Sequence, residues 1–283
     1  MLDLDLGQIR AIVAAALTED RAAEDITTLA VVDPMVRAKA SFLAKSPGVL
    51  AGIAVAEAAF TLLDGTCDVE RRLADGASFD RGDVIATVEG PVSALLRGER
   101  VALNFLQRMS GTATLTRAFV DTVAGTRATI LDTRKTTPGL RDLEKYAVRC
   151  GGGTNHRRDL AVMAMIKDNH REALARAGKT LSQGVEAIRQ RAPGAPVEVE
   201  VDSLDDLEAA LAARPEWVLL DNMSVDEMAE AVRRTAGRAK LEASGGVNLA
   251  SVRAIAETGV DAISVGALTH SAKALDISLD LAF

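Results

Sequence analysis

Cysteine is scarce in this 283-residue sequence, with Cys67 and Cys150 as its two representatives. Two cysteines are too few for a disulfide framework, and their spacing is not that of a zinc site. We therefore expect both thiols to be reduced, as in a cytoplasmic protein. The apolar run near the beginning is far shorter than the roughly 18 residues of a membrane span, and acidic residues replace the basic start of a secretion signal. These features predict neither secretion nor membrane insertion.

Basic residues are in deficit, because 33 Lys and Arg face 40 Asp and Glu for a net charge of −7. A general nucleic-acid surface normally needs a basic face or stripe, so we expect no nucleic-acid partner. Any anion site must then be a local basic pocket. With 48% hydrophobic residues the chain can bury a sizeable core, in one large domain or in two of unequal size.

The first third of the sequence mixes one helix with short strands. Residues 8–18 carry apolar side chains at helical spacing, while residues 37–55 and 69–92 show short alternating runs broken by glycine and proline. This pattern predicts a helix and a small antiparallel sheet. A second helical stripe runs from Leu95 up to Gly111, which is a candidate connector into a second domain.

Beyond this connector, short apolar runs alternate with helical patterns, which predicts a parallel sheet. The predicted strands are residues 128–131, 161–166, 197–201, 217–220, 240–243 and 262–265. Helical patterns at residues 204–211 and 251–257 lie between them. Parallel strands that close into a barrel present their functional side chains at their carboxyl ends, so the residues after each run are the informative ones.

Charged residues, polar residues and glycines follow these runs. The segments concerned are Asp132–Thr136, Lys167–His170, Glu198–Asp202, Asp221–Asn222, Ser244–Gly246 and Gly266–His270. Glycine-rich turns after the last two strands of a barrel can offer backbone N–H groups to a phosphate. Each turn taken alone is also ordinary loop geometry, but the two together favour a phosphate site.

Five side chains form a candidate anion pocket within a largely apolar and glycine-rich window: Arg134, Lys135, His156, Arg157 and Lys167. A single Lys or Arg is more often on a solvated face. As a set, desolvated cations repel one another unless an anion joins them, and Arg binds carboxylate or phosphate with two charge-assisted bonds. The set therefore predicts a substrate with several negative charges.

Two carboxylates, Glu200 and Asp221, end neighbouring predicted strands and suit a Mg²⁺ ion that also binds substrate oxygens. The alternative is that they pair with Lys167 or Lys240. Among the three histidines, His156 is the best functional candidate, since the adjoining glycine-rich loop lets the backbone approach a ligand, whereas His170 can equally cap its own loop. These features indicate a polyphosphorylated substrate without choosing the reaction.

Long stretches of the chain resemble the quinolinate phosphoribosyltransferase family, also called nicotinate-nucleotide pyrophosphorylase (carboxylating). The matching segments are DTRKTTPGLRDLEKYAVRCGGGTNHRRDL (132–160), IKDNH (166–170), EVEVDS (198–203), LLDNMS (219–224), EASGGV (242–247), VGALTHS (265–271), DITT (25–28) and ERVALNFLQRMSG (99–111). The similarity covers essentially the whole chain. The turn at 22–25 departs from the family's glycine-rich version, and Arg158 leaves open whether one or two arginines of its loop face the substrate.

The resemblance implies an α/β fold, with an N-terminal α/β sandwich formed by residues 1–110 and joined by 271–283, and an incomplete α/β barrel formed by residues 111–270. It implies a homodimer with shared active sites, with a hexamer left open. The implied reaction moves a phosphoribosyl group from phosphoribosyl pyrophosphate to quinolinate with decarboxylation. Its products are nicotinate mononucleotide, pyrophosphate and CO₂, as in de novo NAD biosynthesis.

Carried onto the matching positions, the resemblance also implies a role for each site residue. The five residues of the candidate anion pocket, with Thr133, would bind the two substrates, and Arg100 would reach into the partner subunit's site. The catalytic set would be Lys135, Lys167, Glu200 and Asp221, the last two contacting ribose hydroxyls and Mg²⁺. The 5-phosphate would be held by Ser244, Gly245, Gly246, Val265, Gly266 and Ala267.

Two other functions compete with this hypothesis. A related pyrophosphorylase-like protein of molybdate transport shares the barrel, but NHR at 155–157 and KDNH at 167–170 match the quinolinate enzymes. Residues 75–92 look like the hairpins of lipoyl and biotinyl carriers, which present a lysine at an exposed tip. Since no lysine occurs between Lys45 and Lys135, that modification site is missing and the segment is better interpreted as sheet framework.

Overall fold

The computed structural model describes residues 4–283, and the chain divides into two compact units. The first unit contains the chain up to Arg117 together with Thr137–Gly152 and Ser271–Phe283, and the second contains Ala118–Thr136 and Gly153–His270. This division differs from a boundary at residue 110, because a single long helix continues through that point. It also places the segment Thr137–Gly152 with the first unit.

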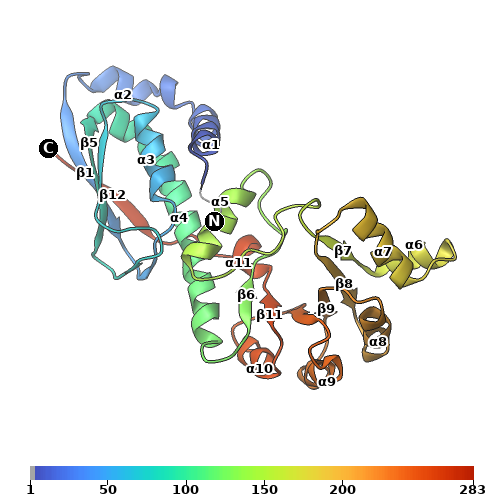
Figure 1. The fold of residues 1–283 in the computed structure, drawn as a ribbon. Coiled ribbons are helices and arrows are strands. Elements are labelled where there is room, and N and C mark those ends of the chain that lie inside the picture. The colour runs from blue at the N-terminus through green and yellow to red at the C-terminus, as the bar shows by residue number, and fades with distance from the viewer. Residues whose placement is uncertain (1–3) are drawn as a thin grey trace. The chain divides into compact units, whose positions relative to one another are not determined.

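The first unit is built around a four-stranded antiparallel sheet in the order β12-β1-β5-β3, of which Figure 1 labels β12, β1 and β5. A separate two-stranded sheet pairs β2 with β4. The helices of this unit are α1 (Leu6–Glu19), the 3₁₀ helix η1 (Ala22–Glu24), α2 (Ile26–Val31), α3 (Ile53–Thr61), α4 (Val92–Thr122, shared with the second unit) and α5 (Arg141–Cys150). Its strands are β1 (Arg37–Ala44), β2 (Gly48–Val49), β3 (Asp68–Arg71), β4 (Ser78–Phe79), β5 (Val84–Pro91) and β12 (Ile277–Ala282).

A helix cap and a buried aromatic contact stabilise these elements. Helix α1 begins where the carboxylate of Asp5 accepts the backbone N–H groups of Gly7 and Gln8, which caps its first turn. Phe42 of β1 meets Phe60 of α3 edge to face, with 6.0 Å between the ring centroids and both side chains fully buried. The predicted helix and small antiparallel sheet are therefore present.

Helix α4 continues beyond Gly111, where the apolar stripe that begins at Leu95 predicted it to end. Gly111 does not end the helix, although glycine costs about 1 kcal/mol relative to alanine in a helix interior. A Cβ at this position would overlap the carbonyl oxygen of Lys273, so the glycine lets the C-terminal segment cross the helix closely. That segment continues into β12, which pairs antiparallel with β1.

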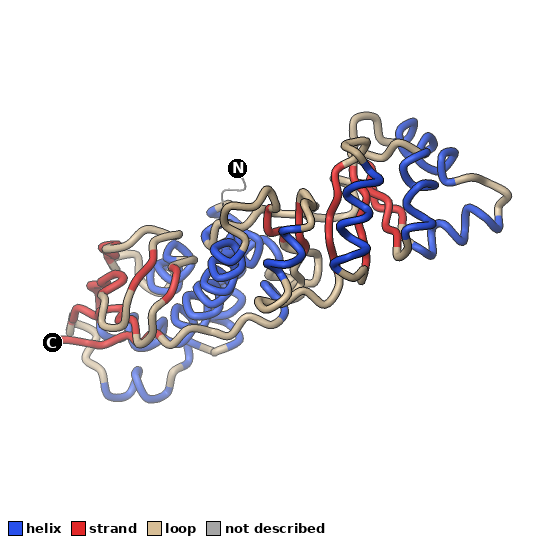
Figure 2. The backbone as a smooth tube through the Cα atoms, turned by 90° about the horizontal axis from the view of Figure 1, so that it is seen from below, coloured by secondary structure: helices blue, strands red, loops and turns tan. Residues whose placement is uncertain are grey.

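The second unit contains a six-stranded parallel sheet in the order β6-β11-β10-β9-β8-β7. Figure 2 draws the strands red and the helices blue. The strands of this sheet are β6 (Thr129–Leu131), β7 (Ala164–Ile166), β8 (Val197–Val201), β9 (Trp217–Asp221), β10 (Lys240–Ser244) and β11 (Ala262–Ser264). All six predicted strands are present. Since β6 and β7 each pair with one neighbour among the described strands, the barrel is incomplete, and the predicted α/β fold class is confirmed.

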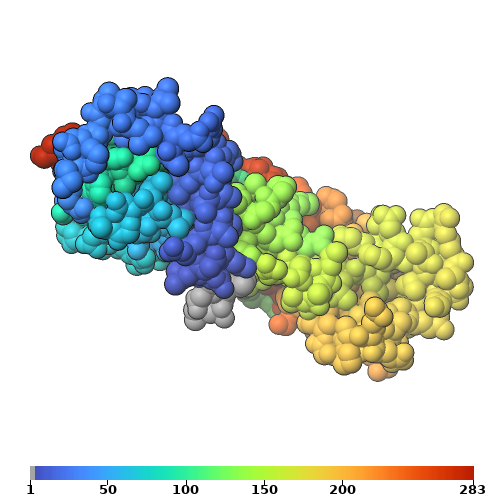
Figure 3. Space-filling view, turned by 90° about the horizontal axis from the view of Figure 1, so that it is seen from above, coloured from blue at the N-terminus to red at the C-terminus, as the bar shows by residue number. Residues whose placement is uncertain are grey.

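Helices follow most of these strands: α6 (Asp168–Arg176), α7 (Leu181–Arg191), α8 (Leu204–Ala212), α9 (Val225–Thr235), α10 (Val252–Glu257) and α11 (Ala267–His270). Caps begin several of them, as where Ser224 and Glu227 bond reciprocally at the start of α9. The two helices α6 and α7 form a continuous part of the second unit's surface (Figure 3). Across residues 4–283, no helix is both long and apolar enough to cross a bilayer.

Candidate active site

A cavity of about 300 Å³ opens at the carboxyl ends of the parallel strands. Its walls come entirely from the second unit, and they are formed by Thr133, Arg134, Lys135, His156, Arg157, Met165, Lys167, Leu219, Asp221, Glu200, Glu242, Ser244 and Ser264. All five residues of the candidate anion pocket are in this set. The sequence had placed them in three separate segments, and the parallel topology brings them to one edge of the sheet.

Cations and carboxylates both line this cavity. Burial and the neighbouring positive charge of Arg134 lower the pKa of the Arg157 guanidinium. In the structure this guanidinium donates to the carbonyl oxygen of Met163 at 3.0 Å. A cation whose pKa is lowered by another cation is stabilised when an anion enters between them.

The two predicted magnesium ligands also line the cavity. Glu200 is the half-buried residue before the last in β8 and forms an ion pair with Lys167. Asp221 ends β9 and accepts a hydrogen bond from the Asn222 side chain at 2.8 Å. The salt-bridge alternative therefore holds for Glu200 in this structure. It does not exclude a metal role, since the same carboxylate still faces the cavity beside Asp221.

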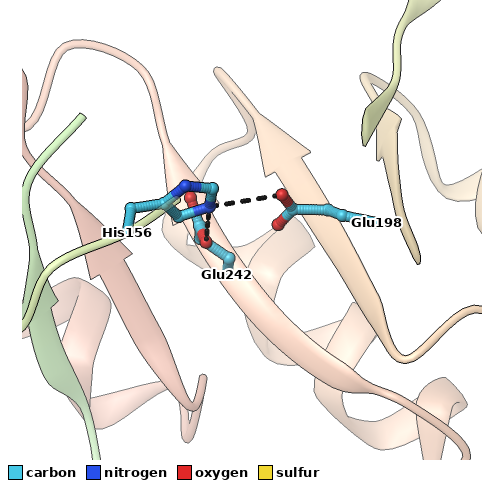
Figure 4. A group of neighbouring side chains, drawn as sticks. All are labelled: His156, Glu198 and Glu242. Carbon is cyan, nitrogen blue, oxygen red and sulfur yellow. Dashed lines mark ion pairs between the residues drawn. The ribbon is translucent and has the colours of Figure 1, made fainter. Parts of the chain in front are cut away.

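A buried cluster lies on the inner wall of the cavity, formed by His156, Glu198 and Glu242 (Figure 4). Nε2 of His156 lies 3.3 Å from Oε2 of Glu198 and 3.2 Å from Oε2 of Glu242, whose side chains are 0% and 2% exposed. The hydroxyl of Ser264 donates to the other oxygen of Glu242 at 2.5 Å. Glu242 and Ser264 were not among the predicted site residues.

The signal that could have found this cluster is strand alternation. Glu198 and Glu200 are two residues apart in β8, so both side chains project from the same face of the sheet. Glutamate is rarely buried without a partner, and Glu198 and Glu242 each lie between two buried apolar residues of their strands. Two charged residues in buried strands indicate a polar interior at this level of the barrel.

The contacts of the cluster indicate where its protons lie. Burial lowers the pKa of His156, but Glu198 and Glu242 outweigh it and raise this pKa. Nδ1 accepts the backbone N–H of Arg157 at 2.8 Å and needs its lone pair, so the ring proton is assigned to Nε2. We assign a second proton to the carboxylates, because burial and the Glu242 charge raise the pKa of Glu198 to about 7.

Asp132 forms hydrogen bonds to the loop that carries His156 and Arg157. It was not among the predicted site residues. Its carboxylate, which is fully buried, accepts the backbone N–H of His156 at 2.8 Å and the side-chain amide of Asn155 at 2.6 Å. The residue follows directly after β6. The loop that carries His156 and Arg157 is therefore tied to the sheet by both its backbone and its side chains.

The turns after β10 and β11 contain the six predicted phosphate ligands, of which Ser244 lines the cavity. Gly245 has a φ of +99°, and a Cβ there would overlap the Asn222 side chain, so only glycine fits. Gly246 is also left-handed, with a φ of +61°. The second turn is formed by Val265, Gly266 and Ala267, beside Lys135 and His270.

Comparisons with known proteins agree on one family. The model described as the quinolinate phosphoribosyl transferase N-terminal domain matches residues 25–110, and the C-terminal domain model matches residues 112–280. A nicotinate-nucleotide pyrophosphorylase (carboxylating) of Mycobacterium leprae is 46% identical over 288 residues, covering 99% of both chains. The chain belongs to the quinolinate phosphoribosyl transferase family.

Solved structures support the same conclusion. The crystal structure of NadC from Streptococcus pyogenes matches with a TM-score of 0.93 and 43% identity, covering 99% of this chain and 98% of the other. The nicotinate-nucleotide pyrophosphorylase from Francisella tularensis matches with a TM-score of 0.92 and 36% identity, with 99% and 98% covered. The resemblance inferred from sequence motifs is confirmed, and the molybdate-transport alternative is not favoured.

Arg100, which the family pattern assigns to the partner subunit's site, and Arg158, whose orientation the sequence left open, are not among the residues that line the cavity. Arg100 is exposed on α4 in the first unit, where it lines a separate hollow of about 310 Å³ with Glu19 and Asp20. Arg158 is exposed and pairs with Asp159 at 3.2 Å. Arg157 is therefore the arginine of the 153–160 loop that lines the cavity within this chain.

Proposed function

We propose that this chain catalyses transfer of a phosphoribosyl group from phosphoribosyl pyrophosphate to quinolinate, with release of pyrophosphate and CO₂ and formation of nicotinate mononucleotide. The observation that carries the proposal is the sharing of one cavity by Arg134, Lys135, Arg157 and Lys167 at the carboxyl ends of parallel strands. A ring with two carboxylates and a sugar with phosphates would balance this charge. The names of the relatives support the same reaction.

In this proposal Arg134 and Arg157 take the two carboxylates of quinolinate, since a planar guanidinium binds a carboxylate with two parallel bonds. His156 completes this wall of the cavity, with Thr133 at its edge. The 5-phosphate of the donor binds the glycine turns after β10 and β11, which contain the six predicted phosphate ligands. Backbone N–H groups in such turns suit a phosphate.

The donor set fits Mg²⁺, because Glu200 and Asp221 offer hard carboxylate oxygens in a cavity with space for water and substrate oxygens. We propose that these two residues hold the ion together with the ribose hydroxyls. When bound, Mg²⁺ would neutralise charge that develops on the departing pyrophosphate. Glu200, which pairs with Lys167 in this structure, would then have two partners, the lysine and the ion.

In this reaction the main contribution of the protein is electrostatic stabilisation by charges held in fixed positions. The bond from the anomeric carbon to pyrophosphate breaks, and both bonding electrons leave with the pyrophosphate, whose charge Lys135 and Lys167 stabilise. The lone pair of the pyridine nitrogen forms the new bond to the anomeric carbon. The resulting pyridinium accepts the electrons of the bond that breaks when the 2-carboxylate departs as CO₂, and one proton then adds to the ring carbon. No covalent enzyme intermediate and no general base for the attack are required.

We further propose a homodimer in which Arg100 reaches the partner subunit's cavity, with a hexamer as an open alternative. The exposure of Arg100 and its place outside this chain's own cavity support the proposal. A cytoplasmic location is proposed from the two free cysteines. Light scattering of the purified protein gives the assembly mass, and a monomeric mass contradicts the shared site.

The reaction is tested by incubating the purified protein with quinolinate, phosphoribosyl pyrophosphate and Mg²⁺ and measuring nicotinate mononucleotide by chromatography. We expect product only when all three are present. Nicotinate, which lacks the 2-carboxylate, is the matched control substrate and should give no comparable rate. Absence of product with quinolinate, in a protein that calorimetry shows to bind another ribosyl acceptor, overturns the proposal.

A further inference from the structure

We propose that Glu198 and Glu242 are positioning residues, which hold His156 so that its ring fixes the backbone of Arg157 and thereby sets the binding of the dicarboxylate ring. The inference deepens the proposed function and rests on it for the identity of the substrate. Neither glutamate has been given a role by the family pattern. The imidazole ring of His156 has contacts at both of its nitrogens, Nε2 and Nδ1.

The first end of the ring faces the sheet. Nε2 of His156 is placed between the carboxylates of two different strands, Glu198 on β8 and Glu242 on β10 (Figure 4). Since the ring proton lies on Nε2, this nitrogen faces both carboxylates as a donor group. Two rigid strands thus hold one flexible side chain, and the hydroxyl of Ser264 on β11 holds Glu242 in turn at 2.5 Å.

The second end of the ring faces the loop. Nδ1 accepts the backbone N–H of Arg157 at 2.8 Å, so the imidazole connects the strands directly to the peptide that carries this arginine. Asp132 supports the preceding peptide through the backbone N–H of His156. The Cα from which the Arg157 side chain extends is then fixed, which helps to hold the guanidinium within about 0.5 Å of the position that binds the substrate.

This geometry also separates positioning from metal binding, the other chemistry that one histidine and two carboxylates could provide. A histidine that binds a metal through Nε2 normally carries its proton on Nδ1 and donates it to an outer partner. In this structure Nδ1 faces an N–H group and acts as an acceptor. The proton on Nε2 therefore occupies the position that a metal would need.

The geometry predicts which kinetic constant changes. Glu242→Gln keeps the size of the side chain but removes the carboxylate that faces Nε2, so we expect KM for quinolinate to rise roughly tenfold, the equivalent of about one lost hydrogen bond to a charged group. Glu198→Gln resembles the protonated carboxyl assigned to this residue, so it should raise KM less. KM for phosphoribosyl pyrophosphate should change less than twofold. Glu172→Gln is the matched control, because Glu172 is exposed on α6 and pairs with Arg176.

A double-mutant cycle tests whether the effect passes through Arg157. In an Arg157→Ala background, Glu242→Gln should add little further loss, because the group that it positions is gone. Fully additive losses, or equal increases in KM for both substrates, would overturn the positioning role. Thermal unfolding of each variant shows whether a loss of activity is only a loss of folding.

A spectroscopic test needs no substrate and no variant of the two glutamates. The chain has three histidines, so ¹⁵N spectra of histidine-labelled protein compared with those of His156→Gln identify the His156 ring. We expect a protonated Nε2 and an unprotonated acceptor Nδ1, and the opposite tautomer overturns the inference. If the wild-type protein makes no product while this tautomer is found, the proposed reaction fails and the positioning geometry stands.

Discussion

Replacing Arg134 by alanine is the sharpest single perturbation of the anion pocket. Arg134 lines the cavity beside Lys135 and contributes to the lowered pKa of Arg157, so its guanidinium is close to the position of a bound anion. Truncating one partner of a desolvated, hydrogen-bonded charge pair costs about 2–5 kcal/mol. At about 1.4 kcal/mol for each factor of ten, kcat/KM for quinolinate should fall roughly 30-fold to several-thousand-fold.

The assay is steady-state product formation at saturating phosphoribosyl pyrophosphate with varied quinolinate. Arg134→Lys should recover only part of the loss, since lysine keeps the charge but not the bidentate geometry. Arg176→Ala is the matched control: this arginine is 80% exposed and pairs with Glu172 on one helix, an arrangement worth about 0.3–0.5 kcal/mol. An activity of Arg134→Ala within twofold of the wild type would refute the assignment.

Three further outcomes are expected. Chelation of divalent ions should abolish turnover, and Glu200→Gln or Asp221→Asn should raise the Mg²⁺ concentration that gives half-maximal rate; an unchanged requirement in both variants contradicts the metal site. Burial raises the pKa of Cys67 to about 11 and that of Cys150 to about 12. Because the thiolate reacts, alkylation of the folded protein at pH 8 should be at least roughly 100-fold slower than that of an ordinary thiol and should accelerate as pH rises toward these values; fast labelling at pH 8 contradicts this. Gly111→Ala should lower the free energy of unfolding by about 1–3 kcal/mol through overlap with the C-terminal segment, as measured by urea titration, and an unchanged midpoint contradicts the close approach.

The fold was predictable because its signals are local and repeated. Each parallel strand appears in the sequence as a short apolar run, and alternation with helical patterns leaves few topologies. The extent of α4 was not predictable in this way. Gly111 is a helix-ending signal by itself, and its reason depends on Lys273, which lies far along the chain and crosses the helix.

Some residues of the candidate site could be predicted from the sequence, and others could not. Arg134 and Lys167 could be selected because charged residues after apolar strands gather at one edge of a parallel sheet. Arg157 could be selected because it lies in a largely apolar and glycine-rich window. Glu242 could not be selected in this way, because its meaning depends on which strands are neighbours in space. Its partner His156 comes from a loop 86 residues earlier, and only the folded structure brings the ring between two carboxylates.

The most direct test of the account uses quinolinate labelled with ¹³C in the 2-carboxylate, together with phosphoribosyl pyrophosphate and Mg²⁺. The account predicts that labelled CO₂, pyrophosphate and unlabelled nicotinate mononucleotide form in equal amounts. Label retained in a ribosylated product, or no turnover by a folded protein that binds both substrates, contradicts it.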